Sequence, residues 1–237
     1  MSDRNRHRES PLGEDKAHSA VAIQQLGHIP ARTATPSPFE TGALELFSHA
    51  FRAEQCQAWI AGLIEQLAWH KDYHEVHGRR FHIPRLQAWV ADAGIQYSYS
   101  NNLLEVQPWS PLLLAIKRAV EARVGHRFNA VLVTYYRNGF DHVTWHADDE
   151  RELGDAPVIA SLSLGAARSF QYQSQMDERI AGVILETGDL LLMRPAFQQG
   201  WLHRVPMEPE VTAGRINLTF RQVVAGEVFE RQRGQSM

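Results

Sequence analysis

The chain has 237 residues, of which 44% are hydrophobic and 22% are charged, and its formal net charge is -3 at pH 7. This length and composition predict one large domain with tails, long enough to bury a sizeable core. The negative balance argues against a protein that coats nucleic acid, because such affinity comes mainly from Lys and Arg on phosphates, although it permits a local basic face.

The chain contains a single cysteine, Cys56, which excludes an internal disulfide framework and a multi-thiolate zinc site. The first residues are rich in Arg and His and lead into no apolar core of signal-peptide length, and no later run approaches a membrane-spanning length. We therefore predict a cytoplasmic protein. Nothing in the sequence demands an assembly larger than a monomer.

The N-terminal part differs in composition from the rest. Residues 1–40 mix charged, Ser, Thr and Pro residues without an apolar period, which predicts a disordered tail. Residues 41–237 are predicted to form the domain. Within it, residues 54–67 and 111–125 carry apolar side chains at three- and four-residue spacing, which predicts two helices that pack on the core.

After Gly125 the pattern changes to short segments rich in Val, Leu, Thr and Tyr, separated by turn residues. Asn138-Gly139 predicts a hairpin between the first two of them. Eight such segments are the number that a jelly roll needs. We predict a mixed α/β (α+β) fold, a cupin-like double-stranded β-helix at residues 126–224 with flanking N-terminal helices. The predicted strands are Ala130–Tyr136, Val143–His146, Val158–Leu164, Ser169–Gln173, Ile180–Leu185, Leu190–Arg194, Trp201–Val205 and Arg215–Val223.

Two histidines and an aspartate form a candidate metal site. His146 and Asp148 are two residues apart, so on an extended segment their side chains leave the same face, although a solvated surface pair explains this spacing equally simply. His203 lies on a late strand that a jelly roll can bring back beside them. Two imidazoles and one carboxylate leave metal positions open, as non-haem iron oxygenases require, but a zinc hydrolase can use the same ligands.

The segment Arg215–Arg221 has an unusual polar face. On a strand, Arg215, Asn217, Thr219 and Arg221 share one side, while the apolar residues between them share the other. Arginines that point into a barrel are costly unless they are paired, and Arg is well suited to fork onto carboxylates. This face therefore predicts a dicarboxylate ligand, with a solvated outer face as the alternative.

Several ordered stretches between about Val76 and Val223 carry a family resemblance. They are Pro84-Arg85-Leu86-Gln87-Ala88, Asp141-His142, His146-Ala147-Asp148-Asp149-Glu150, Ile159-Ala160-Ser161-Leu162-Ser163-Leu164-Gly165, Trp201-Leu202-His203 and Arg215–Arg221. In these stretches the chain resembles the AlkB family of nucleic-acid dealkylating dioxygenases, and it looks most like the animal-type DNA-repair members. Motifs in matching order are far more specific than any one of them alone.

The resemblance implies a cofactor set and its ligands. His146, Asp148 and His203 would bind Fe(II), and O2 would take part in the reaction. The residues implied to hold 2-oxoglutarate are Arg215 and Arg221 at its carboxylates, with Tyr136, Thr219, Asn217 and Thr134, the last standing where many members have Asn.

It also implies how a base reaches the metal, since a base inside a duplex must be extruded before its alkyl group can react. The residues implied to line the base pocket are Tyr97, Tyr99, Glu150 and Asp149. A local basic run, which we predict to be a hairpin turning at Gly78 within a recognition region at about residues 75–100, would contact nucleic acid through His77, Arg79, Arg80 and Arg85.

The implied activity is DNA repair by oxidative removal of alkyl groups from 1-methyladenine and 3-methylcytosine, with release of succinate, CO2 and formaldehyde. The partner would be alkylated DNA, single- or double-stranded, or RNA. Two alternatives stay open: a dioxygenase of the same fold that acts on RNA, protein or a small molecule, and a catalytically silent nucleic-acid reader. A zinc deaminase is poorly supported, because one cysteine cannot supply its paired thiolates.

Overall fold

The computed structural model describes residues 24–25, 35–76, 79–95, 98–99, 102–103 and 105–224. The helices are α1 (Ala53–Gln66), α2 (Pro111–Val124) and α3 (Pro195–Gly200), with a 3-10 turn at Arg151–Leu153. The strands are β1 (Gln24–Gln25), β2 (Leu44–Phe47), β3 (Tyr73–Val76), β4 (Arg79–His82), β5 (Leu86–Ala91), β6 (Ser98–Tyr99), β7 (Asn102–Leu103), β8 (Val106–Gln107), β9 (Ala130–Tyr136), β10 (Val143–His146), β11 (Ile159–Gly165), β12 (Arg168–Ser174), β13 (Ile180–Leu185), β14 (Leu190–Met193), β15 (Trp201–Val205) and β16 (Arg215–Arg221).

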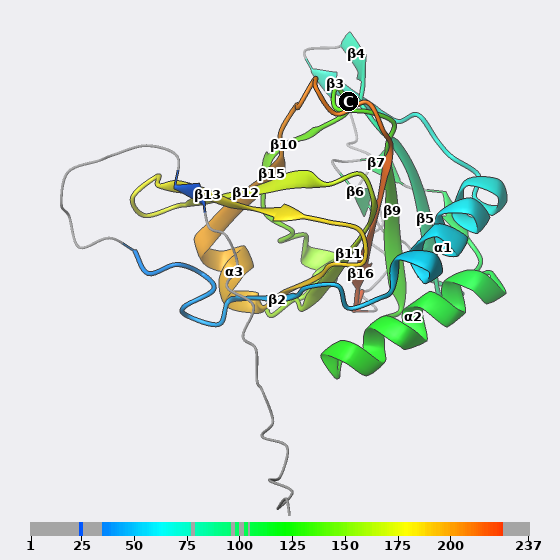
Figure 1. Cartoon of the computed structure of the whole chain (residues 1–237), viewed down its shortest axis with the longest axis horizontal. Coiled ribbons are helices and arrows are strands. Elements are labelled where there is room, and N and C mark those ends of the chain that lie inside the picture. Colours follow the sequence, from blue (N-terminus) through cyan, green and yellow to red (C-terminus); the bar gives the residue numbers. More distant parts are fainter. Residues whose placement is uncertain are drawn as a thin grey trace, which may run out of the picture.

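Two sheets face each other and form the body of the protein (Figure 1). The larger sheet has the strand order β2-β14-β11-β16-β9-β5-β8, and the smaller has the order β1-β13-β12-β15-β10. After β9 the chain passes back and forth between the two sheets, as it does in a jelly roll, except that β12 and β13 are consecutive neighbours in the smaller sheet. The predicted fold class is therefore confirmed, including the helices that precede the jelly roll.

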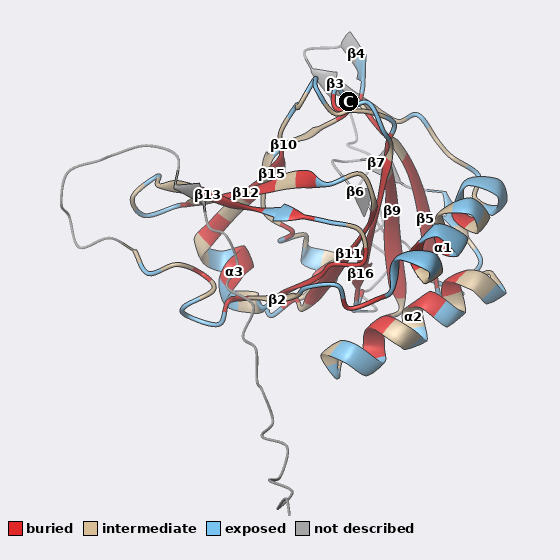
Figure 2. Ribbon diagram, in the orientation of Figure 1, coloured by how far each residue is buried: buried red, intermediate tan, exposed pale blue. Residues whose placement is uncertain are grey.

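Alternating side chains on the large sheet serve two different surfaces. On β16, Ile216, Leu218 and Phe220 pack into a cluster with α1 and α2, which cover the outer side of the sheet (Figure 1). The other face of β16 carries Arg215, Asn217, Thr219 and Arg221 toward the space between the sheets, and all four are buried. In Figure 2 the strands β5, β9, β11 and β16 of the large sheet are mostly buried, while α1 and α2 carry both buried and exposed residues. The sequence thus places a polar face inside the fold.

The second helix begins and ends where its sequence predicts. Ser110 caps it by accepting the backbone N–H of Leu113 at 3.2 Å, and Pro111 occupies the first turn. Gly125 ends the helix in the left-handed conformation, with φ 67°, which costs glycine little. Local signals therefore suffice to fix this element.

The hairpin predicted at Asn138-Gly139 is wrong. The strands on either side of it, β9 and β10, lie in different sheets: β9 pairs with β16 and β5, and β10 pairs with β15. Gly139 does not have a positive φ, which a two-residue type I′ turn requires. Its backbone instead bonds the loop that follows β15, and a Cβ there would overlap the carbonyl oxygen of Glu208. Position 139 has room only for a residue without a side chain, because the loop before β10 and the loop after β15 meet there.

Among the residues described above, no helix is long and apolar enough to span a membrane. The cytoplasmic location, the monomeric state and the domain limits stay predictions.

Candidate metal centre and co-substrate pocket

The two predicted histidines and the aspartate come together between the sheets. β10 and β15 are antiparallel neighbours, and their register sets His146 opposite His203. Asp148 follows β10 by two residues, and one ligand atom from each of the three side chains lies within 4.8 Å of the others. Such a facial set of two imidazoles and a carboxylate fits a divalent metal and leaves positions open for further ligands.

The surroundings of His146 favour a neutral ring with a free Nε2. The Nδ1 of His146 lies 2.8 Å from the carbonyl oxygen of Thr144, so Nδ1–H donates there and the Nε2 lone pair is left for a metal. Burial, followed by the charge of His203, lowers the pKa of His146 to about 4. The His203 ring is enclosed by aromatic rings, with its centroid 5.3 Å from that of Phe170 and 5.6 Å from that of Phe197.

Asp148 is held ionised by the groups around it. Burial would raise the pKa of its carboxyl, but the charge of Arg221 and the hydrogen bond to His203 hold it well below its usual range. Arg221 Nη2 donates to Asp148 Oδ1 at 2.6 Å, and the Asp148 backbone N–H donates to the side-chain oxygen of Gln198 at 2.9 Å. Carboxylate and backbone are therefore fixed from two sides.

A pocket opens beside this cluster, between the two sheets. Its walls combine the polar face of β16 with residues of both sheets, so it can hold a small polar ligand next to the metal ligands. The lining residues are Arg85, Gln87, Leu132, Thr134, Tyr136, Val143, His146, Asp148, Ser161, Phe170, Met193, His203, Val205, Arg215, Asn217, Thr219 and Arg221.

Arg215 has the properties of a carboxylate-binding residue. It is 2% exposed, and its Nη2 donates to Ser163 Oγ at 2.9 Å and to Asn217 Oδ1 at 2.7 Å. Its Nε and Nη1 have no hydrogen-bond partner within the described part of the chain. Burial lowers the pKa of Arg215 to about 10, so it stays charged at neutral pH. A buried, charged and incompletely paired guanidinium fits one end of a dicarboxylate.

The other predicted co-substrate residues lie in the same pocket but have different contacts. Asn217 accepts from Arg215 and Ser161 and donates to Thr219, so its amide is engaged in orienting Arg215. Tyr136 packs its ring 5.4 Å from the Arg215 guanidinium carbon. Thr134 lies opposite Asn217 in the sheet register. Arg221 bonds the metal-ligand candidate Asp148, a contact that the sequence did not predict.

Most of the predicted base-binding and nucleic-acid-binding side chains cannot be placed. His77 and Tyr97 lie outside the described residues. Tyr99 lies in β6, and Arg79 and Arg80 lie in β4, but only their strands are described. β3 and β4 form the predicted hairpin. Asp149 is exposed, Glu150 is half-buried, and neither is among the residues that line the pocket.

Arg85 lies elsewhere than predicted for a surface phosphate contact. It is 4% exposed, lines the pocket and donates through Nη1 to the carbonyl oxygen of His142 at 3.0 Å. The basic run ends at the last turn before β5, and the chain there enters the sheet. Arg85 can therefore meet a nucleic acid only through a group that enters the pocket.

Several residues in or next to the pocket were not identified from the sequence. Gln87 lies two residues after Arg85 on the same face of β5, and alternation from Arg85 could have found it. Met193 and Phe170 read as ordinary core residues. Gln198, on the short helix α3, is 3% exposed and had no local signal.

Comparison with known families decides between iron and zinc. A family model described as the 2OG-Fe(II) oxygenase superfamily matches residues 43–221. The chain belongs to this superfamily. Members use Fe(II), 2-oxoglutarate and O2, so the predicted cofactors are confirmed, and the donor set found here fits them.

Curated relatives confirm the AlkB resemblance. The alpha-ketoglutarate-dependent dioxygenase alkB homolog 3 of Bos taurus is 43% identical over 150 residues, which cover 59% of this chain and 52% of the relative. DNA oxidative demethylase ALKBH2 of Mus musculus is 39% identical over 158 residues, which cover 63% of this chain and 66% of the relative. The match therefore spans about half the length of the alkB homolog 3 proteins.

Solved structures agree with the fold. OsALKBH1 superposes with a TM-score of 0.57 at 17% identity, covering 76% of this chain and 98% of that one. An oxidoreductase of the 2OG-Fe(II) oxygenase family from Burkholderia pseudomallei gives 0.52 at 16% identity, covering 80% and 90%. At these identities the likeness supports the jelly-roll fold alone.

Proposed function

We propose that this protein removes alkyl groups oxidatively from N-alkylated bases in DNA, such as 1-methyladenine and 3-methylcytosine, as a step of alkylation-damage repair. The observation that carries the proposal is the His146, Asp148 and His203 cluster beside a buried, incompletely paired Arg215. Relatives named as a DNA oxidative demethylase and as alkB homologs support nucleic acid as the substrate.

The cluster supplies a place for iron. His146 and His203 would each offer a ring nitrogen and Asp148 one carboxylate oxygen, which leaves positions for 2-oxoglutarate and O2. When bound, iron with 2-oxoglutarate and O2 supplies the oxidation of the N-alkyl carbon, and succinate, CO2 and formaldehyde are released from a methyl lesion.

The pocket residues would orient the co-substrate. Arg215 would take the carboxylate remote from the metal on its Nε and Nη1, which lie ready for an anion. Tyr136, Thr134 and Thr219 would add hydroxyl contacts from neighbouring strands. Arg221 would act on the metal side, because its bond to Asp148 keeps that carboxylate ionised and oriented.

The base would enter from the side of β3, β4 and β6. Tyr97 and Tyr99 would stack on the extruded base, and Asp149 and Glu150 would line its edge. His77, Arg79 and Arg80 would contact the nucleic acid from the hairpin. Arg85, which faces the pocket, would contact the base or the co-substrate rather than a phosphate.

A substrate panel tests the nucleic-acid assignment. Iron-loaded protein and 2-oxoglutarate would be given methylated DNA and RNA oligonucleotides, methylated nucleosides and a methylated peptide, with formaldehyde as the readout. We expect release from the DNA oligonucleotides carrying 1-methyladenine or 3-methylcytosine. Release of formaldehyde from the peptide or the nucleosides alone would be consistent with a dioxygenase but would overturn the nucleic-acid substrate. Release confined to RNA would change the proposed substrate from DNA to RNA.

A further inference from the structure

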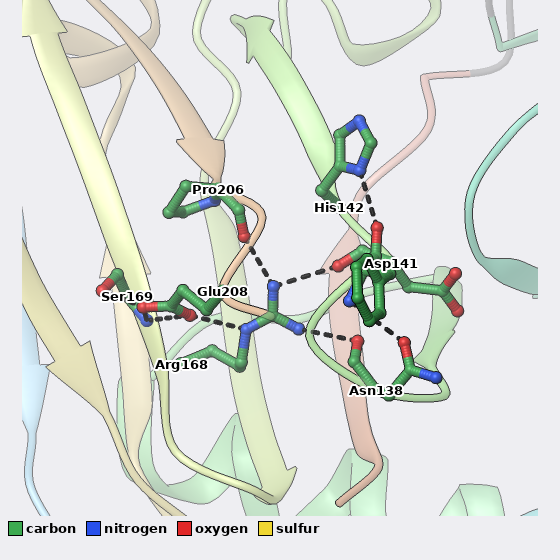
Figure 3. Close-up of polar contacts among 8 residues, drawn as sticks. Asn138, Asp141, His142, Arg168, Ser169, Pro206 and Glu208 are labelled. Carbon is green, nitrogen blue, oxygen red and sulfur yellow. Dashed lines mark hydrogen bonds and ion pairs between the residues drawn. The ribbon is translucent and has the colours of Figure 1, made fainter. Parts of the chain in front are cut away.

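Arg168 is a buried cation outside the pocket. It is the first residue of β12, it is 2% exposed, and four hydrogen bonds leave its guanidinium (Figure 3). Nε donates to the Glu208 carboxylate at 2.6 Å, and the Nη groups donate to the carbonyl oxygens of Asn138 at 3.2 Å, Asp141 at 3.0 Å and Pro206 at 2.6 Å. A buried guanidinium is costly, and bonds to one carboxylate and three carbonyls offset that cost.

The bonded segments are the loops that lead to and from the metal-ligand strands. Asn138 and Asp141 belong to the loop between β9 and β10, and β10 ends at His146. Pro206 and Glu208 follow β15, which carries His203. Figure 3 shows the guanidinium between these two loops. Arg168 therefore fastens β10 to β15 at the end of the pair where Val143 faces Val205.

β10 needs such a fastening more than its neighbours do. It is the last strand in the order of its sheet, so its ladder bonds come from β15, and the register between them shifts between Val143 and His146. An edge strand with an irregular register is weakly specified by backbone pairing alone. The position of His146 relative to His203 thus depends on contacts outside the ladder.

The same cation also touches a pocket wall. The Arg168 guanidinium carbon lies 5.7 Å from the centre of the Tyr136 ring, and that of Arg215 lies 5.4 Å from it. Both distances fall in the cation–π range. Glu208 neutralises Arg168, whereas Arg215 lines the pocket and, within the described part of the chain, has N–H groups available to an anion there.

We propose that Arg168, with Glu208 as its counter-ion, is a positioning residue that sets the spacing of the metal-ligand strands and the seat of Tyr136 beside Arg215. The proposal rests on the ligand assignment made under the proposed function. Lys cannot replace Arg here, because one ammonium cannot reach a carboxylate and three carbonyls in a plane. Arg168→Lys should therefore preserve the charge and lose most of the four hydrogen bonds between the two loops, which we call the Arg168 clamp.

Binding titrations test the clamp without turnover. Mn(II) serves as a redox-inert probe of the metal site, and 2-oxoglutarate is titrated into the Mn(II)-loaded full chain by calorimetry, below the unfolding transition of each variant. We expect Arg168→Lys to weaken 2-oxoglutarate binding about tenfold or more, as losses around metal ligands commonly do. Glu208→Gln should also weaken 2-oxoglutarate binding, but by a smaller factor. This variant tests the proposal if Arg168→Lys does not fold.

Glu121→Gln is the matched control for Glu208→Gln. Glu121 is ion-paired like Glu208, and it lies buried on α2, outside the pocket lining. Two results would overturn the clamp. One is wild-type affinity for 2-oxoglutarate in the Arg168 and Glu208 variants. The other is a loss of affinity no larger than that of Glu121→Gln at the same loss of Tm. His203→Ala separates the two proposals: if it binds Mn(II) and 2-oxoglutarate as wild type does, the ligand assignment itself is wrong.

Discussion

Single residues of the pocket divide into those that hold ligands and those that hold other residues. Within the described part of the chain, Arg215 keeps N–H groups without partners, whereas Asn217 accepts from Arg215 and donates to Thr219, and Arg221 donates to Asp148. The sequence pattern of β16 predicted one polar face but could not assign these partners, because Asp148 is 73 positions away in the chain. By contrast, the two-residue spacing of His146 and Asp148, together with His203 on a late strand, was sufficient to predict this cluster.

The role of Arg215 can be tested by measuring co-substrate binding and metal binding separately. Arg215→Ala should raise the KM for 2-oxoglutarate by at least about tenfold, since a charge-assisted bidentate contact is lost, and should leave Mn(II) affinity close to wild type. Metal-dependent succinate formation and calorimetry measure the two quantities. An unchanged KM would remove Arg215 from the co-substrate site.

The limits of helices and strands were predicted correctly where the local sequence pattern was strong. The limits of β9, β10, β13 and β15 are those predicted, since short apolar runs between turn residues define them. β5 was missed because Leu86–Ala91 is buried on both faces and shows no alternation. The hairpin at Asn138-Gly139 failed for a different reason, because the choice of strand partner is made by distant segments.

Gly139 offers a test of how closely the loop before β10 must approach the loop after β15. Gly139→Ala would drive its Cβ into the Glu208 carbonyl, and such overpacking costs about 1–3 kcal/mol and several degrees of Tm. Gly200→Ala is the control, because no atom lies within 4 Å of a Cβ at that position. Thermal unfolding of both variants should show a loss for Gly139→Ala alone, and equal Tm values would contradict the contact.

The C-terminal half of α2 carries an acid-sensitive contribution to stability. Burial would raise the pKa of Glu121, but the Phe128 backbone N–H, then Lys117 and Arg127, lower it below the ordinary 4.5. A lowered folded-state pKa means that this stability is present above pH 4.5 and is lost as the pH falls through the folded value. Glu121→Gln should therefore reduce Tm at neutral pH, with a difference from wild type that shrinks in acid. A pH-independent difference would contradict this.

At the scale of the whole molecule, two facing sheets bring together ligands that the chain separates widely. Strand count and period predicted the jelly roll, and the helices on the outer face of the large sheet explain why its inner face can be polar. What the sequence could not supply is the packing of loops between the sheets. Arg168 shows this, since its partners are four loop residues, two before β10 and two after β15.

The proposed activity is oxidative dealkylation, which the stoichiometry of the products tests. Protein loaded anaerobically with iron would be given 2-oxoglutarate, O2 and an oligonucleotide carrying 1-methyladenine, and succinate and formaldehyde would be measured together. We expect equal amounts of both, and loss of both in His203→Ala. Succinate without formaldehyde would contradict the nucleic-acid substrate, and the absence of both from the wild-type protein would contradict the enzymatic function.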